Sequence, residues 1–181
     1  VEVAAVHSQI LASNSLCQQV SAKILMQNCG QSIASLPPLD GDAVECGALL
    51  ARLVSTTSQK LGSKIFCGVT GGETTVVLGD GPIGKGGRSQ ELALSFAREM
   101  TLLATPPRRW LILAGGTDGR DGPTDAAGAV IGSECPFDPA AAAQALAVHD
   151  AYNYLQPRGQ LLQVPPTGTN LGDLVYVIAA A

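Results

Sequence analysis

The 181-residue chain is 46% hydrophobic and 14% charged, with a formal net charge of −4. This composition argues against an intrinsically disordered chain, because disorder requires low hydrophobicity. No apolar run approaches the roughly 20 residues of a membrane span, and a negative net charge disfavours binding to a phosphate backbone. We therefore expect a globular protein with no membrane and no nucleic-acid partner.

Short apolar runs alternate with helical patterns at the start of the chain. Residues 9–12 are predicted to form a short strand. A helix follows, which the hydroxyl of Ser13 can cap and which Gly30 is expected to end. Residues 32–36 are the next predicted strand.

A second helix is predicted to begin at Asp42. Asp42 with Glu45 three positions later resembles a capping box, and the helical pattern extends to about Gly62. The alternation of strand and helix is typical of a parallel sheet with crossover connections.

The middle of the chain is rich in glycine. Residues 65–69 and 74–78 are each predicted to form a strand, separated by residues 70–73. The glycine-rich segment 79–88 then leads into a helix whose apolar residues recur every four positions: Leu92, Phe96 and Met100.

Further elements are predicted after this helix. Residues 110–114 form a continuous apolar run, typical of a strand buried on both faces. Residues 140–148 are a short helix and residues 174–180 a final buried strand. Together these patterns predict an α/β fold, a three-layer sandwich with a mostly parallel or mixed sheet.

The glycine-rich loop is the first candidate site. A loop that opens a helix presents free backbone N–H groups and a partial positive charge, which suit phosphate. The predicted phosphate- or nucleotide-binding residues are Gly84, Lys85, Gly86, Gly87 and Arg88. The spacing matches neither a P-loop nor a dinucleotide fingerprint, so a turn carrying solvated cations is the alternative.

Three carboxylates on the loop after the strand at 110–114 form the second candidate site. Asp118, Asp121 and Asp125 are the predicted catalytic residues, and the first two are the candidate Mg²⁺ ligands. They follow the carboxyl end of a predicted buried strand, where ligands bind in open α/β sheets. The alternative is that Asp-Gly pairs simply form turns here.

Two further segments, residues 73–75 and 165–173, carry polar side chains. The hydroxyl, amide and carboxylate groups of residues 165–173 can bind a hydroxy acid or a nucleotide. Both segments also have the composition of ordinary turns. The candidate substrate-binding residues on these segments are Glu73, Thr74, Thr167, Thr169, Asn170 and Asp173.

Four segments, in order, resemble the signatures of the MOFRL domain, the C-terminal half of the class II glycerate kinases: residues 71–76, 84–91, 116–128 and 166–170. The resemblance covers about residues 63–181, and residues 1–62 resemble the end of the preceding domain of that family. Three positions depart from the family, which usually has Asn where Ser89, His149 and Gly172 stand.

The resemblance implies an ATP-dependent kinase that converts D-glycerate to 2-phosphoglycerate with Mg²⁺, in a cleft between two domains. On this basis Arg88 and the glycine loop would hold anionic oxygens, and the three aspartates would orient metal or substrate hydroxyls. Glu73, Thr167, Asn170 and Asp173 would line the cleft.

The resemblance also implies that an N-terminal domain of the same polypeptide completes the site. The family's essential lysine lies in an N-terminal domain, whereas this sequence opens on Val1 with residues 1–6 reading as the inside of a domain. We therefore expect a C-terminal fragment that folds but does not turn over glycerate alone.

Two other function classes stay open. One is a hydroxypyruvate reductase using NAD(P)H, as some family members were described, although the chain has no dinucleotide fingerprint. The other is a non-catalytic binding domain. A homodimer is among the assemblies the chain could form, and the expected location is cytoplasmic or mitochondrial.

Overall fold

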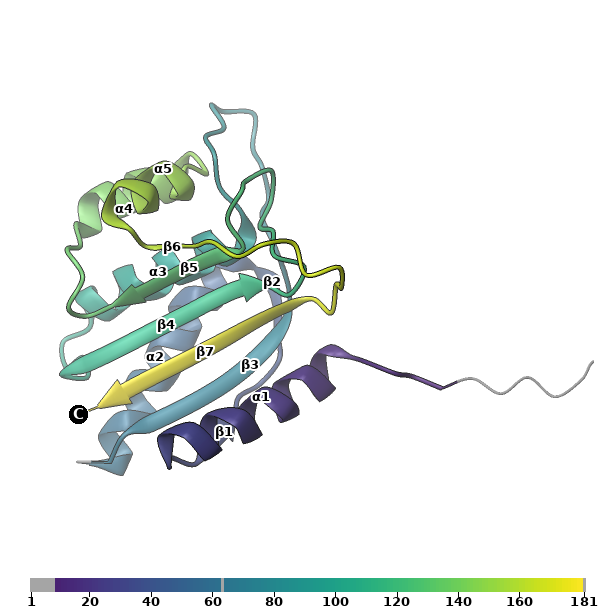
Figure 1. Cartoon of the computed structure of the whole chain (residues 1–181). Helices are drawn as coiled ribbons and strands as arrows, with labels where there is room; N and C mark the ends of the chain where they lie inside the picture. Colours follow the sequence, from purple (N-terminus) through teal and green to yellow (C-terminus); the bar gives the residue numbers. More distant parts are fainter. Residues whose placement is uncertain (1–8, 63, 181) are drawn as a thin grey trace, which may run out of the picture.

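The structure, a computed structural model, describes residues 9–62 and 64–180. In this part of the chain seven strands form one mixed sheet, with helices on both of its faces (Figure 1). The strand order is β1-β3-β7-β4-β5-β6, and β2 also pairs with β3. This confirms the predicted α/β three-layer arrangement. Residues 1–6, expected to start inside a domain, lie outside the described residues.

The helices and strands are listed here in chain order. They are α1 (Asn14–Cys29), β1 (Ile33–Ser35), β2 (Leu39–Asp42), α2 (Ala43–Leu61), β3 (Phe66–Thr75), α3 (Arg88–Leu102), β4 (Arg109–Gly116), β5 (Gly128–Gly132), α4 (Pro139–Ala147), α5 (Ala151–Leu155), the 3₁₀ turn Gln156–Arg158, β6 (Leu161–Leu162) and β7 (Asp173–Ala180). Within the described ranges, no helix has the length and apolarity to cross a membrane.

Helix α1 begins and ends where the sequence predicts. The Ser13 hydroxyl accepts a hydrogen bond from the backbone N–H of Leu16 at 3.2 Å, and Gly30 ends the helix in a left-handed conformation with φ 65°. The strand predicted at residues 9–12 is wrong. Ile10 and Leu11 are more than 80% exposed, and the segment pairs with no described strand.

Asp42 caps helix α2 as predicted, but in the described part of the chain the Glu45 side chain does not complete the predicted capping box. The Asp42 carboxylate accepts hydrogen bonds from the backbone N–H groups of Val44 and Glu45 at 2.9 and 3.0 Å. The helix packs closely against α3 because residue 47 is glycine. A Cβ at this position would lie 2.3 Å from the carbonyl oxygen of Leu92, so any side chain would force the two helices apart.

Residues 66–75 form one strand, not the two predicted. The Gly71-Gly72 pair does not turn the chain, because Gly71 and Gly72 pair with Leu174 and Asp173 of β7. Residues 76–78, expected to be strand, follow β3 as an irregular segment.

The parallel rhythm expected from the sequence holds only at one edge. Strands β1 and β2 run parallel to β3, whereas β7 runs antiparallel to both β3 and β4 and lies between them. Strand β5, which the sequence did not reveal, is antiparallel to β4.

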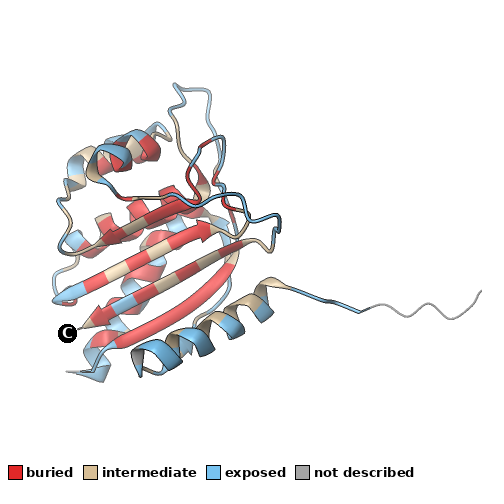
Figure 2. Cartoon of the chain, viewed as in Figure 1, coloured by how far each residue is buried: buried red, intermediate tan, exposed pale blue. Residues whose placement is uncertain are grey.

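The core lies between the sheet and the helices α2 and α3 (Figure 2). The three residues predicted to face inward from α3, Leu92, Phe96 and Met100, are each at most 2% exposed. Phe96 meets Trp110 of β4 edge to face, with 5.7 Å between ring centroids. Strand β4 is not buried equally on both faces: residues directed at α3 are buried, and Leu111 and Leu113 are half-buried.

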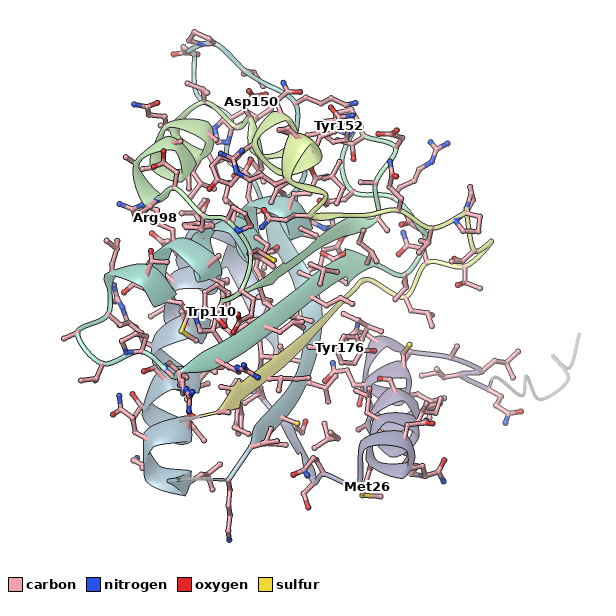
Figure 3. All side chains as sticks on the ribbon, turned by 60° about the vertical axis from the view of Figure 1, so that its left-hand side comes forward. Met26, Arg98, Trp110, Asp150, Tyr152 and Tyr176 are labelled. Atoms are coloured by element: carbon pink, nitrogen blue, oxygen red, sulfur yellow. The ribbon has the colours of Figure 1, made fainter. Side chains whose placement is uncertain are left out.

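Helix α1 covers part of the opposite face of the sheet. Tyr176 of β7 lies between the sheet and this helix (Figure 3), where burial raises the pKa of its hydroxyl. The expected division into residues 1–62 and 63–181 stays a prediction. The elements on its two sides share one sheet, since β1 and β2 pair with β3.

Candidate active site

Most of the predicted site residues meet where three neighbouring strands share one end. Because β7 is antiparallel to its neighbours, its first residue, Asp173, lies opposite Gly72 of β3 and Gly116 of β4. The loops that leave β3 and β4 and the loop that enters β7 therefore converge. Residues far apart in the sequence become neighbours at this edge.

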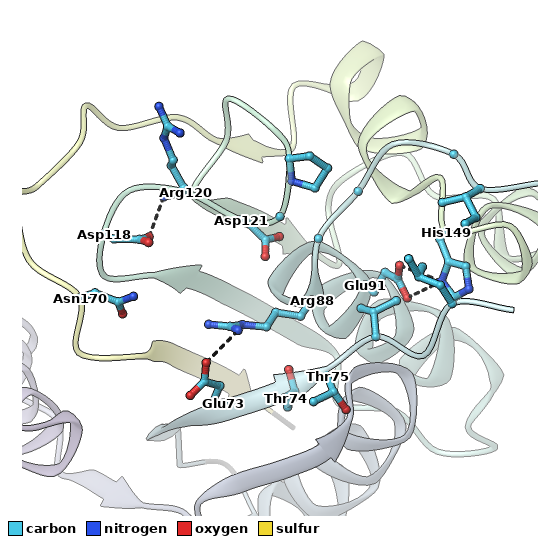
Figure 4. Close-up of a pocket in the computed structure, with 18 residues that line it drawn as sticks. Glu73, Thr74, Thr75, Arg88, Glu91, Asp118, Arg120, Asp121, His149 and Asn170 are labelled. Atoms are coloured by element: carbon cyan, nitrogen blue, oxygen red, sulfur yellow. Dashed lines mark hydrogen bonds and ion pairs between the residues drawn. The ribbon is translucent and has the colours of Figure 1, made fainter.

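These loops and the start of α3 enclose an open cavity of about 620 Å³ (Figure 4). Such a volume is typical of a small-molecule site. The sequence-predicted residues that line it are Glu73, Thr74, Gly84, Gly86, Gly87, Arg88, Asp118, Asp121 and Asn170.

Arg88 is held at the centre of this cavity by two carboxylates. Its Nε lies 2.6 Å from Oδ2 of Asp173 and its Nη2 lies 3.1 Å from Oδ1, so the pair is bidentate. Its Nη1 lies 3.1 Å from Oε1 of Glu73. Asp173 is buried and Glu73 is exposed. Asp173 is thus the fixed partner, and its hydrogen bond is the main reason that the pKa of Arg88 is raised.

Asp121 caps the helix that Arg88 begins. Its two carboxylate oxygens accept hydrogen bonds from the backbone N–H groups of Ser89 and Gln90, at 3.0 and 2.8 Å. The side chain is buried, and burial raises its pKa to about 6 against the opposing effect of these two bonds. Both oxygens are used within the fold, so Asp121 supports the site from behind.

The glycine loop divides its backbone donors between the fold and the cavity. The N–H of Gly84 bonds to the carbonyl oxygen of Val148 at 2.7 Å, and the N–H of Lys85 bonds to Asp150 at 2.8 Å. In the described part of the chain, the N–H groups of residues 86–88 have no hydrogen-bond partner. These three donors are the ones available to an anion.

Lys85 and Asp125 lie apart from the main cavity. Lys85 Nζ is 3.5 Å from the centre of the Tyr152 ring and 3.7 Å from Oδ1 of Asp125. Tyr152 and Lys85 lower the pKa of the Asp125 carboxyl. Lys85 and Asp125 line a second cavity of about 530 Å³. It lies near the end of the molecule where Figure 3 shows Asp150 and Tyr152.

Asp118 and Asp121 both line the main cavity, and in the described part of the chain Asp118 is the one of the two that keeps a carboxylate oxygen without a hydrogen bond. Asp118 is half-buried, and its Oδ1 accepts a hydrogen bond from the N–H of Arg120 at 2.9 Å. Among the described residues, no cluster of three His, Cys, Asp or Glu side chains is arranged to hold a metal ion.

Thr167 and Thr169 shape the loop before β7 and do not line the main cavity. The Thr167 hydroxyl donates to the carbonyl oxygen of Thr117 at 2.5 Å, and its backbone N–H donates to that of Asp118. Asn170 does reach the cavity, while its Oδ1 accepts from the N–H of Gly172.

A contact between a buried carboxylate and a histidine at the other end of the cavity was missed by sequence reasoning. Glu91 of α3 is 2% exposed, and its Oε1 lies 3.2 Å from Nδ1 of His149. Burial raises the pKa of Glu91, and the neighbouring His149 opposes this effect. The one signal in the sequence was that His149 stands where the family usually has Asn. Because His149 and Glu91 are 58 positions apart, the sequence did not indicate that they are in contact.

The chain is similar to known proteins over nearly its whole length. The MOFRL family profile matches residues 66–173. The chain is 33% identical to the glycerate 2-kinase of Pyrococcus horikoshii over 97% of its length, and 41% identical to the D-glycerate 2-kinase of Thermotoga maritima over 76%.

A solved structure agrees with these sequence matches. The crystal structure of the glycerate kinase from Thermotoga maritima superposes with a TM-score of 0.78 at 30% identity, over 93% of this chain and 41% of that one. The chain covers 40% of the Pyrococcus protein and 33% of the Thermotoga sequence, and it corresponds to the C-terminal part of glycerate kinase structures. The chain belongs to the MOFRL family.

Proposed function

We propose that this chain supplies one half of the active site of a kinase that uses ATP and Mg²⁺ to phosphorylate D-glycerate to 2-phosphoglycerate. The observation that carries the proposal is the Arg88 guanidinium, fixed by Asp173 beside the unpaired N–H groups of residues 86–88. The names of the relatives support the substrate and the reaction.

The physical case rests on what phosphoryl transfer requires. The reaction is promoted mainly by positioning and by neutralising charge on the phosphoryl oxygens. Arg88 provides a guanidinium whose position is set before a ligand arrives, so less side-chain freedom is lost on binding. The backbone donors at the start of α3 add a second set of contacts to the same anion.

Glu73 is suited to exchange its contact with Arg88 for a ligand. Its side chain is 73% exposed, so its ion pair with Arg88 adds little to stability. A carboxylate or phosphate group could take its place on Nη1, while Asp173 keeps the other side of the guanidinium. Thr74 and Asn170, which line the same cavity, would then contact the ligand's oxygens.

The residues fit an Mg²⁺ ion that arrives with the nucleotide. Mg²⁺ usually takes one or two carboxylates together with waters and phosphate oxygens. Asp118 is the carboxylate placed to serve in this way, whereas Asp121 has both oxygens committed to α3. When bound, the ion would neutralise charge on the transferred phosphoryl group.

The experiment is an ADP-release assay with ATP, Mg²⁺ and D-glycerate, with ³¹P NMR to identify the product. We expect no turnover by the 181-residue chain. We expect 2-phosphoglycerate once the N-terminal part of the Pyrococcus relative is joined to it. An Arg88→Ala variant of the joined protein should lose most of this activity. A folded joined protein that makes no 2-phosphoglycerate would contradict the proposal, and NADH oxidation with hydroxypyruvate would favour the reductase.

A further inference from the structure

The main cavity has two chemically different ends (Figure 4). Asp118, Arg120 and Asn170 lie at one end, and Glu91 and His149 lie at the other, with Arg88 and Thr74 between them. The lining also includes three aliphatic side chains, which have no part in binding an anion: Val76, Leu78 and Ile83. Leu78 and Ile83 are each 55% exposed, an unfavourable arrangement for large aliphatic groups.

The cavity is larger than the acceptor substrate needs. Its volume of about 620 Å³ lies in the middle of the range of roughly 300–1,000 Å³ for sites that hold drug-sized ligands. A three-carbon acid bound at Arg88 would leave the other end unfilled. A ligand that occupies both ends must be longer and must carry an apolar or aromatic part.

The Glu91–His149 pair fixes one wall of this second end. Glu91 uses its two oxygens on a single atom, Nδ1 of His149, at 3.2 and 3.4 Å. In the described part of the chain, Nε2 of His149 has no hydrogen-bond partner. The ring is 21% exposed and lines the cavity. It therefore presents a planar, partly polar surface to a ligand.

The backbone of His149 has a strained conformation. His149 has φ 54°, and it is the only non-glycine residue in the described ranges with a positive φ. Such a conformation persists where surrounding structure enforces it, and it clusters at ligand sites. Here Gly84 bonds to Val148, and a Cβ on Gly86 would lie 3.2 Å from the His149 carbonyl oxygen. The glycine loop thus contacts the backbone on both sides of His149 and restricts its conformation.

We propose that the end of the cavity where Glu91 and His149 lie is a nucleoside subsite. The imidazole would stack on the base, and the apolar side chains that line the same cavity, Val76, Leu78 and Ile83, would contact it. The inference rests on the proposed function, because it places the nucleoside of the phosphoryl donor. Glu91 is a positioning residue that sets the orientation of the ring. The donors of residues 86–88 lie on the loop between the two ends, where the phosphates of the same nucleotide would bind.

The presence of only two histidines in the chain makes the test direct. Ring ¹H–¹³C spectra of the 181-residue protein are recorded during titration with adenosine, ADP and D-glycerate, and a His149→Asn variant assigns the His149 signal. We expect adenosine and ADP to shift this signal, because an aromatic base changes the field at a stacked ring. D-glycerate should shift it by much less.

Matched variants separate contact from structure. Ile83 and Ile24, which lies on α1, have nearly equal exposed fractions of 55% and 52%. Ile83→Ser should weaken adenosine binding at least fivefold, whereas Ile24→Ser should leave it unchanged. His149→Asn retains an N–H donor for Glu91 and accepts a positive φ. It should preserve the unfolding midpoint while weakening adenosine binding at least threefold.

Two results would overturn the subsite. One is the absence of any shift of the His149 signal with both adenosine and ADP, and the other is equal weakening by the two isoleucine variants. These results are distinct from failure of the kinase proposal. A shifted His149 signal without turnover by the joined protein leaves the subsite in place, and turnover with an unshifted signal removes the subsite alone.

Discussion

Asp173 holds the guanidinium of Arg88 with both carboxylate oxygens across a separation of 85 positions in the sequence. The first residue of the last strand thereby sets the direction of the first side chain of α3. The side chain of Asp173 is 9% exposed and that of Arg88 is 32% exposed, so the pair is mostly shielded from water. Charge-assisted bonds of this kind are shorter and stronger than neutral ones.

The two carboxylates on Arg88 should differ in their effect on stability. Asp173→Asn removes a shielded bidentate partner and should lower the free energy of unfolding by about 2 kcal/mol. Glu73→Gln removes an exposed partner and should lower it by less than about 0.5 kcal/mol. Urea unfolding of the two variants and the parent protein measures both. Equal losses would show that burial does not distinguish these two contacts.

Arg88 and Lys85 should differ in their effect on anion binding. Arg88→Ala should weaken sulfate binding by about 1.5–3 kcal/mol, the value of a hydrogen bond to a charged group. Lys85→Ala should have little effect, because Lys85 lies over Tyr152 and lines the second cavity. Calorimetric titration with sulfate at constant ionic strength tests this. A larger loss with Lys85→Ala would move the anion site to the second cavity.

Asp121 should make stability depend on pH in a definite direction. Its folded-state pKa of about 6 lies above the ordinary value of 3.8, so its contribution is fully present well below pH 4 and is lost as pH rises through 6. The loss amounts to about 3 kcal/mol, from roughly two pKa units at 1.36 kcal/mol each. Asp121→Asn cannot ionise and should escape this loss.

Urea unfolding of this variant and the parent protein at pH 4 and pH 7 provides the measurement. The difference in unfolding free energy should move in favour of Asp121→Asn by about 2.5 kcal/mol between these two pH values, because part of the total loss has already occurred at pH 4. A difference that is constant with pH, or that moves in favour of the parent protein, would contradict the raised pKa.

The helix cap also requires the absence of a side chain at residue 87. A Cβ on Gly87 would lie 2.4 Å from Cγ of Asp121, although its φ of −158° is accessible to any residue. Gly87→Ala should therefore cost about 1–3 kcal/mol of unfolding free energy through overpacking. Gly79→Ala is the control, because a Cβ at this position meets nothing within 4 Å. Similar unfolding midpoints for the two variants would show that the cap can move aside without cost.

Local signals predicted the helices well. Ser13, Gly30 and Asp42 act on groups within four residues of themselves, so their chemistry is visible in a short window of sequence. The pairing of strands was less accessible. Nothing in the apolar run at residues 174–180 indicates that it enters between β3 and β4 in the opposite direction, since this depends on contacts between segments far apart in the chain.

The same distinction applies to the site. Each of the four motifs contributes residues to one cavity, and nine of the fourteen predicted site residues line it. The task of each carboxylate could not be derived from spacing. Asp121 and Asp118 lie on the same loop, yet one caps a helix that begins 33 positions earlier in the sequence and the other faces the cavity. The roles proposed here for the site residues stay predictions until they are measured.

The central position of β7 has a kinetic consequence. This strand is the last to leave the ribosome among the described elements, yet it joins β3 to β4. Until it is in place, the sheet consists of two separate parts, and such non-local pairing is slow. Arg88 also lacks its partner Asp173 until that moment. Closure of the sheet and assembly of the Arg88 site should therefore be one event, so that the competence to bind sulfate appears with the final folding phase and not before it.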